Sequence, residues 1–199
     1  MYRPDAFRED RPEVLHDAIG RIGFATLVTR DLDANHLPML LDVCADRSVL
    51  RGHVARANPV WKQGSGQGLA IFLGPHGYIS PNWYPSKAVT GKAVPTWNYL
   101  TIQARGQIDW IHDQAWLHAH VSDLSDAHEK PRPNPWKVED APLGYVEGLL
   151  RAIVGFELTV ATLEGKYKFS QNRQADRAGV RDGLLGEGRQ DLARWMDEP

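Results

Sequence analysis

The chain has 199 residues and a formal net charge of −2, with 42% hydrophobic and 24% charged residues. This composition is typical of a soluble globular protein, and the near-neutral charge argues against a strongly basic nucleic-acid-binding chain. No apolar run approaches the roughly 20 residues that span a bilayer. The charged N-terminus carries no apolar signal segment. We therefore expect a cytoplasmic protein without a membrane segment.

The residue pattern predicts mainly β structure with flanking helices, an α+β fold. Apolar residues recur at helical spacing over residues 14–22, and Gly23 is a plausible end of that helix. Strands are predicted at residues 24–30 and 37–43, joined by a turn. The remaining predicted elements are strands at 48–54, 69–73, 77–80, 98–111 and 153–163, helices at 59–63, 114–125 and 143–152, a mobile loop at 85–93, and a helical tail.

The predicted domain organisation is a core with one appendage. We find no internal repeat and no linker long enough to divide two independent domains. The prediction is a core domain over residues 1–172 and a C-terminal helical extension over residues 173–199 that packs on it. Cys44, the single cysteine, cannot form an internal disulfide, and its apolar strand context predicts a small core residue.

A cluster of polar side chains follows the last apolar run. If that strand continues, alternation places Lys166, Lys168 and Ser170 on one face. Three further donors follow at the strand end: Gln171, Asn172 and Arg173. No carboxylate lies among them, which suits an anion such as a phosphate, because phosphate oxygens need several charge-assisted donors. The alternative is a solvated edge strand whose lysines discourage aggregation.

Five separated motifs occur in the order found in one protein family: His36-Leu37-Pro38, His53-Val54-Ala55-Arg56-Ala57-Asn58-Pro59, Phe72-Leu73-Gly74-Pro75-His76, Val94-Pro95-Thr96-Trp97-Asn98 and Ile153-Val154-Gly155-Phe156. The chain resembles the PaiB-type FMN-binding negative transcriptional regulators, which belong to the FMN-binding split-barrel group, from residue 1 to about residue 185. The resemblance implies a homodimeric split barrel with FMN at the dimer interface, and a regulatory role.

The resemblance assigns further candidate flavin-binding residues. It makes Arg56 a phosphate ligand, with His53 beside it; the alternative is that Arg56 is an ordinary surface residue. Thr96, Trp97 and Asn98 can offer an isoalloxazine ring an apolar wall and hydrogen-bonding groups, although Trp97 and Asn98 point to opposite faces of a regular strand and Trp97 can equally belong to the core. His36 precedes an extended Leu-Pro pair and suits the lip of a site.

Charge gives DNA binding no support. The tail after residue 172 resembles a helix-turn-helix most closely, but its charges sum to −1, which leaves little counterion release to drive binding. Its connector at residues 182–188 also has too many glycines for a tight helix pair. DNA therefore stays a conceivable partner that the charges do not favour.

Two classes of function remain, and both use a flavin. One is a flavin-linked regulator or sensor. The other is a flavin-dependent oxidoreductase that uses reduced nicotinamide and a small acceptor, with the cofactor supplying the chemistry. Haem binding is a third alternative, without a decisive axial ligand in the sequence. No catalytic residue can be assigned from spacing, and His118 and His120 face different directions on a predicted helix, which argues against a metal site.

Overall fold

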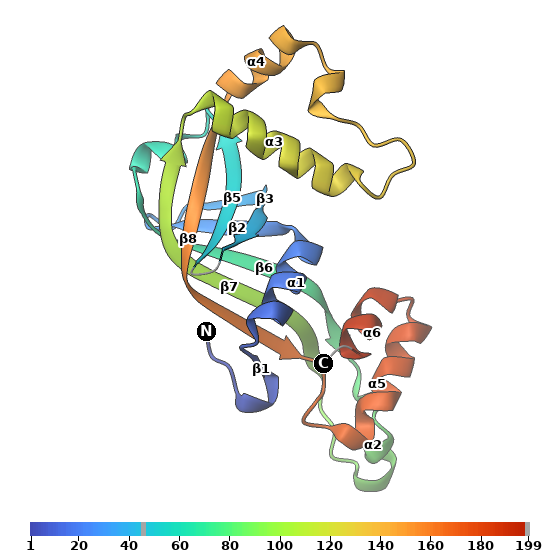
Figure 1. Ribbon diagram of the computed structural model, residues 1–199. Helices are drawn as coiled ribbons and strands as arrows, with labels where there is room; N and C mark the ends of the chain where they lie inside the picture. The colour runs from blue at the N-terminus through green and yellow to red at the C-terminus, as the bar shows by residue number, and fades with distance from the viewer. Residues whose placement is uncertain (45–46, 198–199) are drawn as a thin grey trace. The chain divides into compact units, whose positions relative to one another are not determined.

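The computed structural model describes residues 1–44 and 47–197. Its strands form a mainly antiparallel sheet in the order β3-β2-β6-β7-β8-β5-β4, and β1 pairs with β8 (Figure 1). The strands are β1 Arg8–Glu9, β2 Phe24–Thr29, β3 Ala34–Pro38, β4 Leu40–Val43, β5 Ser48–Ala55, β6 Gly66–Ile79, β7 Thr96–Ile111 and β8 Ile153–Lys168.

Helices connect and follow these strands, so the predicted class, mainly β with flanking helices, is confirmed. The helices are α1 Pro12–Ile22, α2 Pro85–Thr90, α3 Gln114–Glu129, α4 Leu143–Arg151, α5 Gln174–Gly186 and α6 Gln190–Asp197. Short 3-10 helices are η1 Asp5–Phe7, η2 Pro59–Gln63, η3 Pro81–Trp83 and η4 Val138–Asp140. Among the described residues, no helix combines the length and apolar character needed to cross a bilayer.

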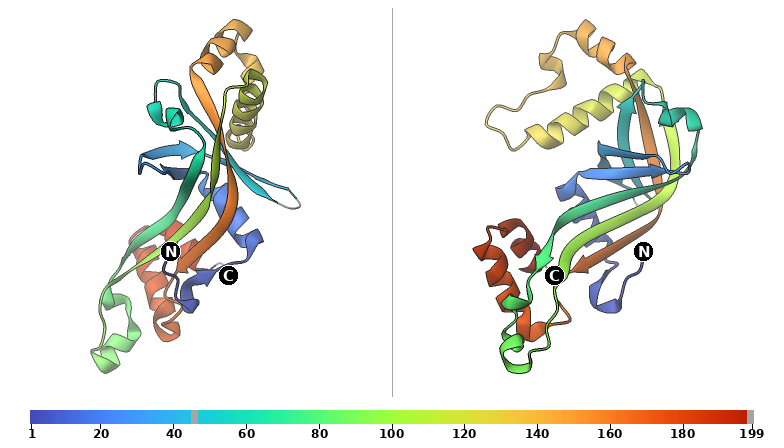
Figure 2. Two further views of the ribbon diagram at one scale, coloured as in Figure 1. Left: turned by 90° about the vertical axis from the view of Figure 1, so that its left-hand side faces the viewer. Right: turned by 180° about the vertical axis from the view of Figure 1, so that it is seen from behind.

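Three long strands, β6, β7 and β8, run side by side in the sheet (Figure 2). The sequence pattern predicts two separate strands where β6 is continuous from Gly66 to Ile79. The reason is Gly74-Pro75, a pair that is typical of turns but here lies within the strand. Gly74 is buried at this point, and a Cβ there would lie 2.9 Å from the Leu100 side chain, so a close approach requires glycine.

The chain divides into two compact units, which are taken in turn. Unit 1 comprises Met1–Ala18, Phe72–Gln103 and Leu163–Pro199. Its apolar interior includes Phe72, Leu100, Phe169 and Leu184, each at most 2% exposed. Unit 2 comprises Ile19–Ile71 and Ala104–Thr162.

In unit 1, α5 contacts η3, α2 and α6. The predicted mobile loop at 85–93 is in part the helix α2, because Pro85 begins it and the Asp176 carboxylate accepts hydrogen bonds from the Ser86 amide at 2.9 Å and hydroxyl at 2.8 Å. The glycine-rich stretch at residues 182–188, which was expected to be a connector, is mostly helical, because α5 continues to Gly186. Gly179 and Gly183 lie within α5, where a Cβ would meet Trp83 at 2.2 and 2.3 Å, so these glycines permit close packing.

In unit 2, the hairpin of β2 and β3 pairs Phe24 with Pro38, and β5 pairs with β8 from Val49–Thr159 to Ala55–Ile153. One buried cluster joins α3, η4 and α4 through Leu117, Val138, Val146 and Leu150. Cys44 follows the end of β4 and is exposed, which corrects the expectation of a core residue. The apolar run that suggested burial ends one residue earlier, at the exposed Val43.

Candidate functional site

Two lysines on β8, in unit 1, present their ammonium groups without an acidic partner. Lys168 Nζ donates to the Thr96 hydroxyl and, at 2.8 Å, to the carbonyl oxygen of Trp97. Lys166 Nζ donates to the Tyr2 carbonyl oxygen at 3.1 Å and lies over the rings of Tyr2 and Tyr99, at 5.4 and 5.5 Å from their centroids. Throughout residues 1–44 and 47–197, neither lysine forms an ion pair. The positive charge on this face is therefore uncompensated.

Burial acts against the charge on Lys168. Desolvation lowers the pKa of the Lys168 ammonium, and the neighbouring charge of Lys166 lowers that pKa further. A lysine begins at an ordinary pKa of 10.5, so a lowered value can still leave it protonated at neutral pH. An anion between these groups would relieve both penalties at once.

An exposed aromatic surface lies on the neighbouring strands of unit 1. The Trp97 side chain is 52% exposed. His76 stacks on it with ring centroids 6.2 Å apart, and Tyr78 meets it edge-on at 6.5 Å. Arg189 Nη2 donates to the His76 carbonyl oxygen at 2.6 Å, which fixes this part of β6. Trp97 is thus held by its neighbours while one side of the indole stays open to a planar ligand.

The residues after Lys168 lie differently from the sequence expectation. β8 ends at Lys168, and Ser170 is a buried residue with a left-handed φ of 62°, so it does not continue the lysine face. Ser170 Oγ exchanges hydrogen bonds with the fully buried Asn98, on the opposite face from Trp97. The alternation argument fails here because the strand stops two residues earlier than Ser170.

The next three candidates also have local partners or open surroundings. The Gln171 side chain accepts from the Phe169 amide at 2.7 Å and donates to the Tyr167 carbonyl oxygen at 2.6 Å. Asn172 is exposed. The Arg173 guanidinium lies 4.9 Å from the Tyr84 ring centroid and 3.5 Å from the Asp176 carboxylate.

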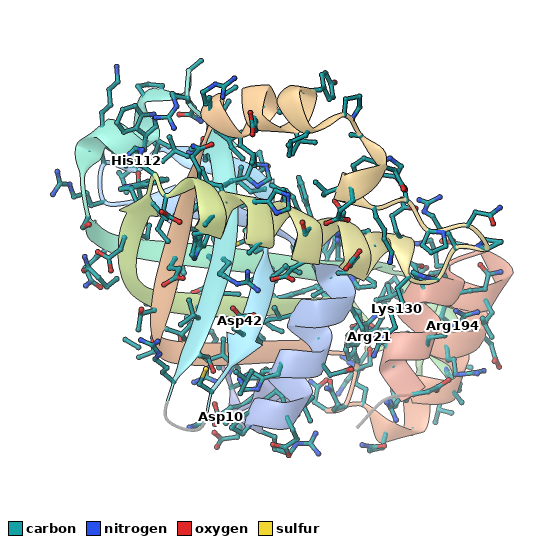
Figure 3. The ribbon with its side chains drawn as sticks, turned by 45° about the horizontal axis from the view of Figure 1, so that its top comes forward. Asp10, Arg21, Asp42, His112, Lys130 and Arg194 are labelled. Carbon is teal, nitrogen blue, oxygen red and sulfur yellow. The ribbon has the colours of Figure 1, made fainter. Side chains whose placement is uncertain are left out.

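In unit 2, the Arg56 guanidinium ties two chain segments together. Arg56 Nε donates to the Arg151 carbonyl oxygen at 2.6 Å, and Nη2 donates to that of Ile153 at 2.8 Å. His112, where β7 leads into α3, places its Nδ1 3.4 Å from Nη1 (Figure 3). Arg56 therefore stabilises the start of β8 whether or not it also meets a ligand. His36 Nδ1 lies 3.0 Å from the Thr26 hydroxyl.

His53 belongs to a second polar cluster in unit 2. His53 Nδ1 lies 3.1 Å from Nε2 of His120, and Trp116 stacks on His120 with centroids 5.2 Å apart. Burial lowers the pKa of His53, and burial followed by the neighbouring His53 and Arg51 lowers the pKa of His120 to about 4. Both imidazoles are consequently neutral at pH 7. A neutral His53 can donate a hydrogen bond but brings no positive charge.

Sequence reasoning missed several of these neighbours. Tyr99 is two residues from Trp97 on one strand, so alternation alone could have added it to the predicted wall. Tyr2 and the stacked His76 come from distant segments and give no such signal. His120 was weighed only as a metal ligand, because a helix position does not reveal a partner on β5. No group of metal-ligating residues is found in the part of the chain that the structure describes.

Comparison with protein families assigns the chain. Residues 1–162 match the family described as "Putative FMN-binding domain". The chain belongs to this FMN-binding family. Its relatives include the protease synthase and sporulation protein PAI 2 of Bacillus subtilis, which is 31% identical over 94% of this chain and 90% of its own. The PaiB-type resemblance drawn from the separated motifs is thereby confirmed. Lys166 and Lys168 lie just beyond the matched range.

Other relatives of the FMN-binding family are similar at comparable identity. An uncharacterised protein of Emericella nidulans is 37% identical over 79% of this chain and 76% of its own. Solved structures agree in fold at lower identity. The flavocytochrome Anf3 from Azotobacter vinelandii has a TM-score of 0.59 at 12% identity, covering 84% of this chain and 72% of its own.

A second solved structure is the FAD and haem binding protein from Mycobacterium smegmatis. It has a TM-score of 0.54 at 14% identity, covering 81% of this chain and 73% of its own. These likenesses confirm the split-barrel fold that the family resemblance implied.

Proposed function

We propose that the protein binds FMN on the face formed by Lys166, Lys168 and Trp97, and acts as a flavin-linked regulator or sensor. The observation that carries the proposal is the pair of ammonium groups without a carboxylate partner, one of which donates to the backbone carbonyl oxygen of Trp97, a residue with an exposed indole. A phosphate fits the two cations, and a flat ring fits the open side of Trp97. When bound, FMN would supply redox chemistry; the residues of the chain hold and orient it.

The donor set around Lys168 suits a phosphate better than a neutral ribityl end. Each hydrogen bond to a charged group contributes about 1.5–3 kcal/mol, so two ammonium groups should separate FMN from riboflavin by several kcal/mol. The Thr96 hydroxyl already accepts from Lys168 and keeps its own proton for a further acceptor. These residues therefore support FMN over an uncharged flavin.

A titration of the flavin-free protein with FMN and riboflavin tests the cofactor proposal. FMN should bind at least about 100-fold more tightly, as the two charged hydrogen bonds imply. Equal affinity for the two flavins would contradict the proposal. An absorption spectrum of the purified protein is the companion measurement: flavin bands are expected, and a Soret band would favour haem instead.

The proposal includes a homodimer. Large apolar side chains are exposed on the strands of unit 1 that carry the site, including Leu73 at 53% and Tyr78 at 50%, and such surface is characteristic of an interface. A second copy would cover it and shield a flavin ring from water. Sedimentation of the flavin-bound protein should give a dimer, and a monomer that retains flavin would contradict this part.

The regulatory role rests on family membership and on the relative named for protease synthesis and sporulation in Bacillus subtilis. Flavin occupancy would be the signal, and the dimer the element that it controls. Gel-shift assays and reduced-nicotinamide oxidation test this role on the same preparation. Oxidation faster than that of free FMN, abolished when the lysine pair is replaced, would favour an oxidoreductase. A flavin-dependent change in dimerisation without turnover would favour the regulator.

A further inference from the structure

Unit 2 contains a cavity that the flavin proposal does not use. Its volume is about 360 Å³, within the range of small-molecule sites. It is bounded by β5, α3, the segment around η4, and α4, all within unit 2. Apolar side chains provide most of its wall, among them Val121, Val138, Val146, Leu150 and Ile153. None of its lining residues is Asp, Glu, Lys or Arg.

One imidazole faces this apolar wall. His53 lines the cavity, and its Nδ1 is occupied by His120 at 3.1 Å. Its Nε2 forms no hydrogen bond to any residue that the structure describes. The Ser125 hydroxyl, also in the lining, donates its hydrogen bond to the Val121 carbonyl oxygen at 2.8 Å. His53 Nε2 is consequently open to a ligand, as are the Trp136 indole N–H and the Tyr145 hydroxyl, the other polar side-chain groups of the lining.

The surroundings of His120 indicate which ring nitrogen of His53 carries the proton. His120 is fully buried, and its Nδ1 has no partner among the described residues. A buried N–H without an acceptor is rarer than a lone pair without a donor. The proton of His120 therefore sits on Nε2 and is donated to His53 Nδ1, which leaves the proton of His53 on Nε2. His53 thus presents an N–H donor to the cavity.

We propose that this cavity binds a small, uncharged, mainly apolar molecule whose carbonyl oxygen accepts a hydrogen bond from His53 Nε2. An aryl ketone has this chemistry: its ring system fits the aliphatic wall, and one acceptor meets one donor. A carboxylate does not, because it would leave water for a wall without a cation. The site is independent of the proposed FMN face, whose residues all lie in unit 1.

Three matched ligands test the proposal by equilibrium dialysis at pH 7 against the full chain, with and without saturating FMN. They are 2-acetylnaphthalene, the hydrocarbon 2-isopropenylnaphthalene, which replaces the carbonyl oxygen by a methylene group, and 2-naphthoate. The ketone should bind roughly tenfold more tightly than the hydrocarbon, the worth of one hydrogen bond, and naphthoate should bind most weakly. Equal binding of ketone and hydrocarbon, or no binding of the ketone, would overturn the proposal.

Variants locate the binding. Ala141→Phe fills the lining and should abolish ketone binding, whereas Ala127→Phe makes the same change at an exposed position on α3 and should leave it intact. His53→Leu, which removes the donor, should abolish the preference of ketone over hydrocarbon even if Ala141→Phe proves unstable. Retained binding in folded Ala141→Phe would contradict the assigned cavity. Displacement of the ketone by equimolar FMN would show that the cavity belongs to the flavin site, and would equally overturn the proposal.

Discussion

The lysine face of unit 1 and the histidine pair of unit 2 show the same physical effect with opposite results. In both places burial lowers the pKa of a basic side chain, Lys168 in one and His120 in the other. The lysine starts at 10.5 and can stay charged, whereas the histidine starts at 6.5 and becomes neutral. Because the two side chains start from different pKa values, a similar lowering leaves unit 1 with a face suited to anions and unit 2 with a cavity suited to neutral ligands.

The largest expected effect concerns anion binding by the lysine face of unit 1. Replacing both lysines, Lys166→Gln with Lys168→Gln, keeps a hydrogen-bonding side chain at each position but removes two positive charges. FMN affinity should fall at least about 100-fold, and riboflavin affinity should barely change. Fluorescence titration measures both.

The matched control for the lysine pair is Lys92→Gln with Lys130→Gln, which removes the same charge at exposed positions, Lys130 following the end of α3 (Figure 3). It should leave FMN binding unchanged. A similar loss in both double variants would mean that net charge, and not this face, attracts the phosphate.

Acidification tests whether His120 in unit 2 is neutral in the folded protein. Between pH 6.5 and about 4 the unfolded chain binds a proton at His120 that the folded protein does not. The free energy of unfolding should therefore decrease as pH falls through this window, by at most about 3 kcal/mol. His120→Gln should flatten the pH profile measured by urea unfolding, and His128→Gln, at an exposed position of the same helix, should not. Identical profiles for the two variants would refute a buried neutral His120.

Packing around the histidine pair offers a smaller effect. A Cβ on Gly155 would lie 2.2 Å from the indole of Trp116, which stacks on His120. Gly155→Ala should lower the free energy of unfolding by about 1–3 kcal/mol. Gly148→Ala, within α4, meets nothing closer than 3.9 Å and should raise it by up to about 1 kcal/mol. Thermal unfolding compares them, and equal stability of the two would show that Trp116 moves freely.

The smallest expected effect sharpens the assignment of Lys168. Because its pKa is lowered, Lys168 should lose its proton below the ordinary lysine value of 10.5. FMN affinity should then fall by about tenfold as pH rises from about 8 to about 10.5, a range in which the phosphate keeps its charge. The pH dependence of riboflavin affinity measures any contribution from titration of the isoalloxazine ring itself. Parallel pH dependence of the two flavins would exclude Lys168 as the titrating group.

Much of the fold followed from local pattern. Apolar alternation and helical spacing predicted β7, β8, α1 and α3, and buried residues do recur at strand spacing along β7 and at helix spacing in α1. Prediction failed where a residue's role depends on a distant neighbour. Gly183 indicated a loose connector, yet it lies against Trp83, about a hundred positions earlier in the chain. A glycine that permits close packing and one that permits a turn look alike in sequence.

The candidate site shows the same contrast between features that follow from local pattern and features that depend on distant residues. Lys166 and Lys168 were named from sequence because strand alternation places them on one face, and Thr96 and Trp97 were named because they offer an isoalloxazine ring a hydrogen-bonding group and an apolar wall. Ser170 was misplaced because its left-handed backbone, which bends the chain away, leaves no mark in the residue pattern. The pairing of His53 with His120 joins β5 to α3 across 67 positions, and composition cannot reveal it.

The segmented make-up of unit 1 has a consequence for biosynthesis. Unit 1 draws on Met1–Ala18 and also on Leu163–Pro199, whereas the segments of unit 2 end at Thr162. A ribosome releases the chain from its N-terminus, so unit 2 has all its residues available first. Residues 1–18 must wait for residues 163–199 to emerge. The lysine face is therefore completed only after residues 166 and 168 have emerged, and a nascent chain stalled before residue 163 would be unable to retain FMN there.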